Sequence, residues 1–228
     1  MESTAEVIDF LEVSNITNSE SKNTELFKAI HRSQHCQRNY DLSKTMPTED
    51  IKTIVTAATQ CPSKQNIAFY KLHVVVNRDK INQIYECCSG KDASGTQFPQ
   101  NPQVLGNLVL VFEHYENYDN SGPNSNPETQ LQDEDSLRIL TQDRFTALGI
   151  AAGYVNLVSS QLGYATGCCS CIIDSSKLQE VIGGENTPLL VMGIGFKQKN
   201  KNRRVHHLKD NVIFSTRKKQ SIEIKYIN

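Results

Sequence analysis

The stretch FTALGIAAGYVNLVSSQL, residues 145–162, is the longest apolar segment of the chain. At helical spacing its apolar side chains leave almost no polar face, which predicts a helix that is buried on most sides. Gly149 and Gly153 lie four residues apart and therefore on one face, where they permit another helix to approach closely. We expect this helix to occupy either the centre of the core or an interface between subunits.

Shorter apolar runs on both sides of this segment predict a sheet. The runs at residues 72–76, 108–112 and 189–194 are typical of buried strands. Amphipathic or capped patterns predict a helix that begins at Thr48 and further helices at residues 24–30, 79–86 and 175–181. No regular βαβ repeat and no break in composition appear, so we expect one α+β domain over residues 1–228, with a mixed sheet flanked by helices.

Length and charge exclude several classes of protein. The 228 residues carry 24 Lys and Arg against 25 Asp and Glu, a formal net charge of -1, which argues against binding nucleic acid through bulk charge. No apolar run reaches the roughly 20 residues of a membrane-spanning helix. Residues 1–14 are acidic, unlike an export signal. We expect a cytoplasmic protein with no nucleic-acid or membrane partner.

The charge is nevertheless uneven along the chain. Residues 113–135 hold seven acidic residues and no Lys or Arg, a composition that predicts a long polar loop. Residues 197–219 are strongly basic, with Asp210 as their one acidic residue. The alternating residues 222–227 then predict a half-buried terminal strand, which needs a sheet edge of its own or of a partner.

Seven cysteines include the cluster Cys168-Cys169-Ser170-Cys171. A structural metal site usually needs a second Cys or His pair, which is missing here, so we expect a loop of reduced thiols and no metal. The Gly193-Ile194-Gly195 segment resembles the start of a dinucleotide motif, but Gln198 and a basic stretch follow it instead of a helix. Three polar or basic segments, at residues 31–38, 62–66 and 201–204, are candidates to converge on an anion.

Four segments together resemble the nitroreductase family of flavoproteins. Residues 34–41, QHCQRNYD, resemble its phosphate motif Arg-x-Ser-x-Arg/Lys-x-aromatic-Asp, and residues 57–66, AATQCPSKQN, are similar to its Ala-Pro-Ser-x-x-Asn segment. Residues 149–164 resemble its central helix, which ends in Leu-Gly, and residues 190–203 its last strand and basic tail. The segments occur in the family's order and cover most of the chain.

This resemblance implies an α+β fold with a mostly antiparallel sheet and an intertwined homodimer, in which the extension 205–228 reaches the partner subunit. It also implies an FMN-dependent oxidoreductase. Such an enzyme takes electrons from NAD(P)H and passes them through bound FMN to a small aromatic, nitro or quinone-like acceptor. No protein acid or base is required, so we name no catalytic side chain.

The resemblance assigns cofactor contacts residue by residue. Arg38 takes the basic phosphate position, His35 a neighbouring contact, and Gln34 and Cys36 replace the family's Arg and Ser. Arg32 is placed to compensate for Gln34. The phosphate contacts of the basic tail fall on Lys201 and Arg203. Contacts near the flavin ring and ribityl chain fall on Pro62, Ser63, Lys64 and Asn66, and the loop with Cys169 and Ser170 presents backbone amides to the ring.

Two alternatives remain open at this point. The departures at Gln34 and Cys36 leave room for a flavin-binding protein of the same fold with little or no turnover. The basic stretch 197–219 is also a candidate nucleic-acid surface, although Phe214 is its only aromatic residue.

Overall fold

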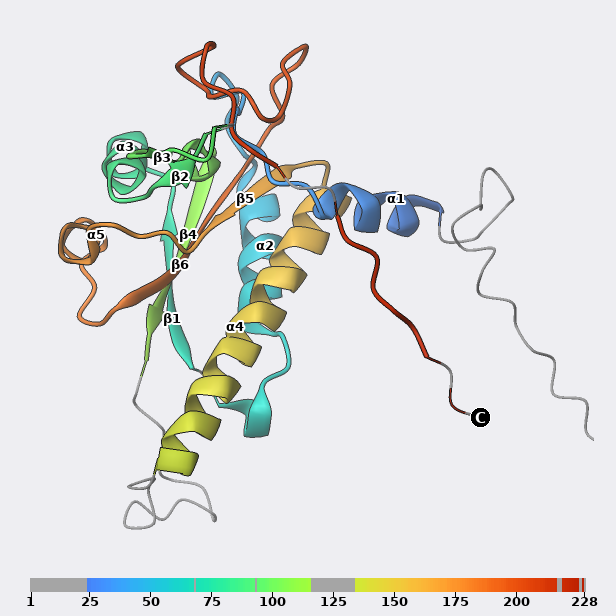
Figure 1. Ribbon diagram of the computed structural model, residues 1–228, viewed down its shortest axis with the longest axis vertical. Coiled ribbons are helices and arrows are strands. Elements are labelled where there is room, and N and C mark those ends of the chain that lie inside the picture. Colours follow the sequence, from blue (N-terminus) through green and yellow to red (C-terminus); the bar gives the residue numbers. More distant parts are fainter. Residues whose placement is uncertain are drawn as a thin grey trace, which may run out of the picture.

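The computed structural model describes residues 24–67, 69–92, 94–115, 134–216, 219–225 and 227. A four-stranded antiparallel sheet with the order β1-β4-β6-β5 lies between helices (Figure 1). Its strands are β1 (Tyr70–Val75), β4 (Leu108–His114), β5 (Ala165–Cys169) and β6 (Pro188–Gly195), and a separate hairpin pairs β2 (Gly90–Lys91) with β3 (Gln97–Phe98). The helices are α1 (Thr24–Ser33), α2 (Thr48–Thr59), α3 (Arg78–Glu86), α4 (Glu134–Gln161) and α5 (Ser175–Ile182), with the short turns η2 (Lys64–Asn66) and η3 (Pro102–Val104).

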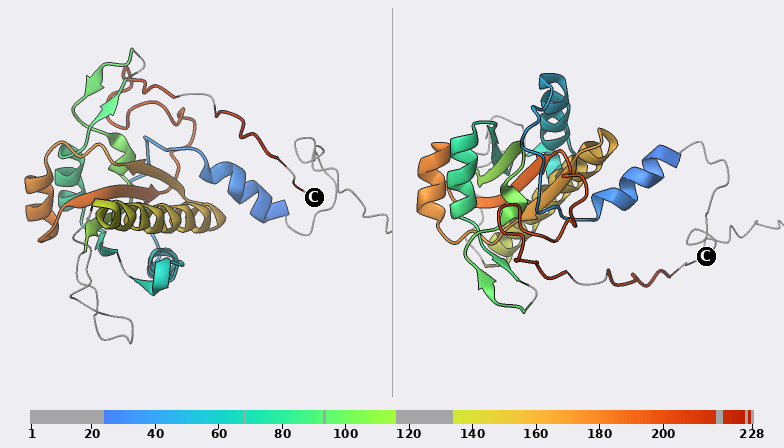
Figure 2. Two further views of the ribbon diagram at one scale, coloured as in Figure 1. Left: turned by 60° about the horizontal axis from the view of Figure 1, so that its bottom comes forward. Right: turned by 90° about the horizontal axis from the view of Figure 1, so that it is seen from above.

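Strand β4 explains why the core has two halves. All but the last of its residues are buried, because the strand has a neighbour on each edge and helices on each face. Successive strand side chains point to opposite faces. Leu108, Leu110 and Phe112 pack in the cluster with α2 and α4, while Val109 and Val111 pack in the cluster with α3 and α5. Figure 2 shows the resulting three layers, with α3 and α5 on one face and α4 on the other.

Near the β5 edge of the sheet, two glycines allow the backbone of η3 to cross in direct contact with the strands. Gly167 in β5 pairs with Gly193 in β6, and the backbone of Gln103 lies directly against both. A Cβ atom at either glycine would overlap the Gln103 backbone, so these positions accept no side chain without a shift of η3. The glycines of the rejected dinucleotide motif therefore have a packing role here.

The predicted helices and the strands predicted at 72–76, 108–112 and 189–194 are present. Strand β5 was not expected, and it contains Cys168 and Cys169 of the predicted thiol loop. A further difference lies in α4. The helix begins at Glu134, well before the apolar segment that predicted it. Ala147, Leu148 and Val155 face the core, but Phe145 and Tyr154 are 54% and 45% exposed, so burial on most sides is wrong for the single chain. Among the described residues, no helix is both long and apolar enough to cross a membrane.

Two predictions near the chain's polar segments have mixed outcomes. Glu113 and His114 belong to β4 and Glu134 begins α4, so the predicted loop 113–135 is shorter at both ends, and residues 116–133 lie outside the described part of the chain. The terminal strand predicted at 222–227 is not seen in the described residues of the single chain, and its pairing with a partner's sheet edge stays a prediction. Residues 219–225 form no strand, because they leave the body on the side of α1 and meet no sheet edge (Figures 1 and 2).

The basic stretch after β6 folds back onto the body before the tail leaves. His206 is fully buried and its ring stacks on Phe214 at 5.9 Å between centroids. The His206 Nδ1 atom accepts from the backbone N–H groups of Leu208 and Lys209 at 2.9 and 3.1 Å. Nε2 therefore carries the proton and donates to the Tyr85 hydroxyl at 2.7 Å. A neutral imidazole thus fastens this segment to α3.

This arrangement predicts a loss of stability in mild acid. Burial, followed by the charges of Lys209, His207 and Lys201, lowers the pKa of His206 to about 4. An imidazole in the unfolded chain titrates near pH 6.5. Between these two values only the unfolded chain binds the proton. The free energy of unfolding should therefore fall as the pH falls from about 6.5 towards 4, by up to about 3 kcal/mol.

Urea unfolding at pH 7.5 and pH 5 measures this change. The variant His206→Gln should show a smaller difference between the two pH values than the wild type, because it removes the buried titrating group. His31→Gln, which replaces an exposed histidine, is the control. Equal pH dependence in wild type and His206→Gln would contradict the assignment.

Candidate functional site

The candidate site begins with residues 34–41, which run beside the β5 edge of the sheet. Cys36 forms a parallel bridge with Thr166, and the Gln37 N–H donates to the Thr166 carbonyl at 2.7 Å. The buried Tyr40 hydroxyl lies 3.0 Å from the carbonyl oxygen of Gln103 and 3.2 Å from that of Gly193. Tyr40 therefore ties the segment to the glycine crossing, and burial raises its pKa, so the hydroxyl stays protonated as a donor.

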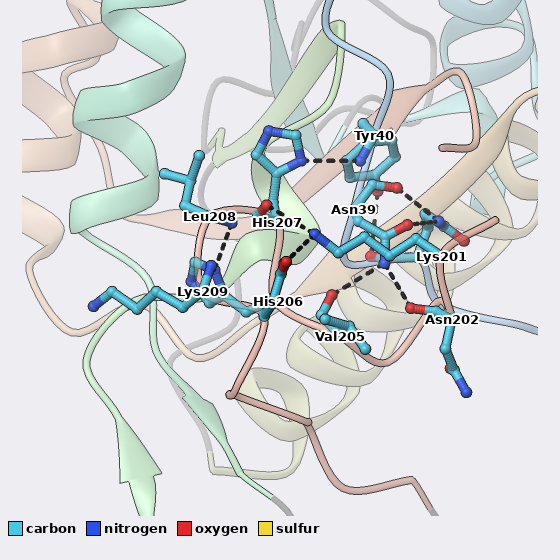
Figure 3. A network of polar contacts seen from close by, with 11 residues as sticks. Asn39, Tyr40, Lys201, Asn202, Val205, His206, His207, Leu208 and Lys209 are labelled. Atoms are coloured by element: carbon cyan, nitrogen blue, oxygen red, sulfur yellow. Dashed lines mark hydrogen bonds and ion pairs between the residues drawn. The ribbon is translucent and has the colours of Figure 1, made fainter. Parts of the chain in front are cut away.

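The segment after β6 joins the same place (Figure 3). The Asn39 side chain donates to the carbonyl oxygens of Asn202 and Val205 at 2.7 and 3.0 Å. The Tyr40 N–H donates to Nδ1 of His207 at 3.3 Å. Two segments more than 160 residues apart in the chain are thereby held side by side, as the resemblance implied for the phosphate motif and the basic tail.

Arg38 is the central group of this region. Its side chain is only 8% exposed, and its guanidinium carbon lies 5.4 Å from the ring centroid of Phe214. In the amide orientation that satisfies both neighbours, Gln103 accepts from Arg38 Nη2 at 2.9 Å and donates to the Cys168 carbonyl. Among the described residues, the Nε and Nη1 atoms of Arg38 are buried without a hydrogen-bond partner. Two charged donors are therefore available to an acceptor that lies outside the described residues.

The electrostatics around Arg38 are cationic. Burial is the main cause that lowers the pKa of Arg38, and the charges of Arg203 and Arg204 add to it. Arg203 reaches the segment directly, because its Nη1 donates to the Cys36 carbonyl at 3.2 Å. Burial and Arg203 also lower the pKa of His35, which favours the neutral imidazole. We call Arg38 and Arg203 the cationic cluster, with the neutral His35 beside them; a guanidinium remains charged under all physiological conditions, so the cluster attracts anions.

Strand β5 connects the cationic cluster to the cysteine-rich loop. The loop starts at the end of β5, four residues after Thr166, which corresponds to about 13 Å of strand. The Cys169 side chain is buried in the core, whereas Ser170 is exposed. The loop thus exposes Ser170 to solvent and keeps the Cys169 thiol inside.

The third predicted segment does not join the other two within one chain. Ser63 precedes η2, Asn66 has a left-handed backbone with φ 57°, and Lys64 forms an ion pair with Asp143 of α4 at 2.5 Å. Arg32, beside the cationic cluster in sequence, donates to the carbonyl of Ser160 at the other end of α4, at 3.2 Å. These two contacts are 17 residues apart on α4, which is about 25 Å. The contacts predicted near the flavin ring, Pro62, Ser63, Lys64 and Asn66, are therefore remote from Arg38.

Three other predicted phosphate contacts engage the protein itself. Arg32 is occupied as described above, and the Gln34 amide donates to the His31 carbonyl at 2.9 Å. Lys201 pairs with Asp210 and also donates to the His207 carbonyl at 3.3 Å. Of the cations predicted at the phosphate, Arg38 and Arg203 are the two that the structure places together.

Sequence reasoning missed Gln103 and Phe214, both of which contact the Arg38 side chain. Gln103 follows Asn101-Pro102, which carries no binding signal. Phe214 was noted only as an aromatic residue in a basic stretch. Their roles depend on the chain crossing the sheet and folding back, which no local pattern encodes.

Comparison with known proteins places the chain among flavoprotein relatives. A sequence model described as the nitroreductase family matches residues 31–196. No curated protein matches the chain.

Solved structures give the same result for the fold. A nitroreductase family protein from Clostridium novyi NT is 16% identical, with a TM-score of 0.57 over 78% of this chain and 90% of that chain. An FMN complex of a protein from Exiguobacterium sibiricum 255-15 is 18% identical, with a TM-score of 0.54 over 83% and 95%. A Staphylococcus epidermidis protein, whose name proposes an NAD(P)H:FMN oxidoreductase, is 17% identical, with a TM-score of 0.56 over 84% and 93%. At these identities the likeness concerns the fold.

The unpaired guanidinium predicts an anion-dependent gain in stability. Inorganic phosphate at ten times its Kd should stabilise the wild type by about 1.4 kcal/mol, which raises Tm by about 3–5 °C. Arg38→Met should abolish this gain. Without phosphate, the variant should be at least as stable as the wild type, because it removes a buried charge that lacks a partner and keeps the side-chain length.

Thermal unfolding with and without phosphate tests both statements. Lys199→Met, which removes an exposed charge from the same basic stretch, is the matched control and should keep the response. A phosphate response in Arg38→Met equal to that of the wild type would show that the anion binds elsewhere.

Proposed function

This chain belongs to the nitroreductase family, and we propose that it is an FMN-dependent oxidoreductase. In this proposal it takes electrons from NADH or NADPH and passes them to a small aromatic, nitro or quinone-like acceptor. The family match over residues 31–196 and the α+β fold support the oxidoreductase class. The FMN complex of a structural neighbour supports the cofactor.

The observation that carries the proposal is the unpartnered guanidinium of Arg38. FMN ends in a phosphate dianion, and an arginine fork binds phosphate oxygens through charge-assisted hydrogen bonds. Nε and Nη1 of Arg38 are two charged donors on different edges of the guanidinium, buried without an acceptor among the described residues. Arg203 adds a second guanidinium beside Cys36, and the neutral His35 offers a further donor. The residues present therefore fit a phosphate group.

The cysteine-rich loop supplies the other end of the proposed site. When bound, FMN would accept two electrons from the nicotinamide and pass them to the acceptor. In this proposal the exposed Ser170 would donate hydrogen bonds towards the ring, which needs main-chain donors more than a particular side chain. This would explain why cysteines are tolerated in the loop. The chain itself then binds and orients the cofactor and carries no proton in this scheme.

We propose that the site is completed in a homodimer. Lys64 contacts Asp143 and Arg32 contacts Ser160, two positions about 25 Å apart along α4, so we infer that one chain does not bring residues 62–66 and the cationic cluster to one cofactor. The α4 face with Phe145, Gly149, Gly153 and Tyr154 is exposed in the single chain. An exposed apolar stripe on a long helix is typical of an interface. A partner packed there would place its residues 62–66 near the cluster.

A second candidate function is flavin binding with little or no turnover. The observation in its favour is the substitution of the family's Arg and Ser by Gln34 and Cys36. The Gln34 side chain donates a hydrogen bond to the nearby His31 carbonyl oxygen. The nucleic-acid alternative loses support, because Lys201, Arg203 and Arg204 of the basic stretch all make contacts within the fold.

Cofactor binding and reduction test the two flavin proposals. Purified protein should bind FMN, and Arg203→Ala should raise the Kd for FMN about tenfold or more because a charge-assisted contact is lost. Lys199→Ala is the control with an exposed basic residue. Under anaerobic conditions NADH or NADPH should bleach the visible absorbance of bound flavin. Binding without bleaching by either nucleotide would favour the second candidate, and a protein that ignores FMN would defeat both.

The dimer has a test of its own. A Cβ atom added at Gly153 meets no described atom within 4 Å, so Gly153→Leu should leave the single chain folded. If this face packs against a second copy, the leucine should separate the subunits. Size-exclusion chromatography with light scattering measures the mass, and Lys80→Leu, on the exposed side of α3, is the control. A wild-type protein that is already monomeric would overturn the proposal.

A further inference from the structure

Two buried thiols meet where the end of α3 lies against the loop after β5. Cys88 is fully buried, and Cys169 is 2% exposed. Residues 87–89 and 171–173 run antiparallel beside each other, joined by Ser89 N–H to the Cys171 carbonyl at 2.9 Å and by Ile173 N–H to the Cys87 carbonyl at 2.9 Å. The backbone therefore holds the two cysteine-bearing segments in a fixed register.

The Cys169 sulfur lies in polar surroundings inside this core. Asn101 Nδ2 donates to it at 3.2 Å, and the Ser89 carbonyl oxygen lies 3.6 Å away. Cys88 lies in the same buried cluster, and its thiol is the main cause that lowers the pKa of Cys169, while the pKa of Cys88 is raised. The pair thus has one thiol suited to ionise and one suited to stay protonated, which is the asymmetry that thiol exchange requires.

We propose that Cys88 and Cys169 form a reversible disulfide that modifies the cysteine-rich loop. With a small-molecule disulfide RSSR as the oxidant, one S–S bond forms between the two cysteines as the S–S bond of RSSR breaks. The two cysteines lose two electrons, RSSR gains them, and the two thiol protons leave with the two RSH products. Both thiols are buried, so the exchange proceeds through local opening of the chain.

Neighbouring cysteines have different environments and are not part of this pair. The Cys168 side chain lies near Asn156 of α4, on the opposite face of β5, and burial raises its pKa to about 12. Cys171 is exposed. Among the described residues, no group of three Cys, His, Asp or Glu is arranged to hold a metal ion, so a thiol redox function suits the pair better than metal binding.

The disulfide has a consequence at the proposed flavin site, and this consequence rests on the proposed function. Bond formation brings the two sulfur atoms to about 2.05 Å, closer than any non-bonded contact. It also removes the acceptor of the Asn101 amide and draws Cys169 towards α3. Because Ser170 follows directly, its backbone amide shifts with it. We expect FMN to bind about fivefold more weakly, or worse, to the oxidised protein.

Peptide mapping tests the disulfide without any cofactor. The reduced protein is incubated for hours with oxidised glutathione, its free thiols are blocked with N-ethylmaleimide, and it is digested with trypsin. The sequence predicts that Cys88 lies in peptide 81–91 and Cys169 in peptide 145–177. We expect a cross-linked pair of these peptides that dithiothreitol separates. Recovery of both peptides with every cysteine blocked would overturn the proposal.

Variants assign the bond to its two sulfur atoms. Peptide 81–91 also contains Cys87, and peptide 145–177 also contains Cys168 and Cys171. The cross-link should persist in Cys87→Ser and Cys171→Ser and vanish in Cys88→Ser and Cys169→Ser. Fragment ions of the wild-type cross-link give the same assignment if a buried variant fails to fold. A cross-link assigned to Cys87 or Cys171 would overturn the proposal.

Titration with FMN then separates the two proposals. The Kd for FMN is compared between the oxidised and reduced wild type, with Cys88→Ala treated in the same way as the control. A weaker Kd in the oxidised wild type alone supports the coupling, and an unchanged Kd overturns it. A protein that forms the cross-link but binds no FMN in either state would contradict the proposed function and leave the disulfide standing.

Discussion

The close approach of the Gln103 backbone to Gly167 and Gly193 is the constraint on which the candidate site depends. Only glycines allow the chain to cross the sheet at this point. The crossing lets the Gln103 carbonyl oxygen accept a hydrogen bond from the Tyr40 hydroxyl. It also places the Gln103 side-chain amide next to Arg38. A larger residue at either glycine would push η3 outward. Tyr40 and Arg38 would then lose their contacts with Gln103. The packing of this region and the position of Arg38 therefore depend on the same two glycines.

A second feature is the accumulation of positive charge around a buried arginine. Burying a guanidinium without a counterion costs free energy, because the lost hydration is not replaced. The fold nevertheless buries the Arg38 guanidinium against the Phe214 ring. It also brings Arg203 to the backbone of Cys36, two residues before Arg38. In such an arrangement the fold is less stable without a bound anion, and binding of an anion restores the lost stability. This is the physical reason to read the cluster as a binding site and not as part of the structural core.

The sequence predicted much of the fold because its signals were local. The apolar runs of β1, β4 and β6 and the amphipathic patterns of the helices appear close to where they were expected. The first turns of α4 were missed because the helix was predicted from the long apolar run alone, whereas residues 134–144 hold only Leu137, Ile139 and Leu140 as apolar residues. Residues 222–225 form no strand within the single chain, since an alternating pattern indicates a capacity to pair but supplies no neighbouring strand; pairing with a partner subunit stays a prediction. Ile222, 80% exposed, still lacks a partner within the described residues.

For the site, the sequence by itself indicated the family, and the resemblance of short motifs predicted Arg38 and Arg203 as phosphate contacts. Only the tertiary structure decided that these two residues meet, that Gln103 and Phe214 enclose Arg38, and that Lys64 pairs with Asp143 far away. It also brought Cys88 next to Cys169 across 80 residues of chain. Motif spacing describes neighbours along the chain, whereas these contacts depend on how strands and helices pack, which is a property of the whole fold.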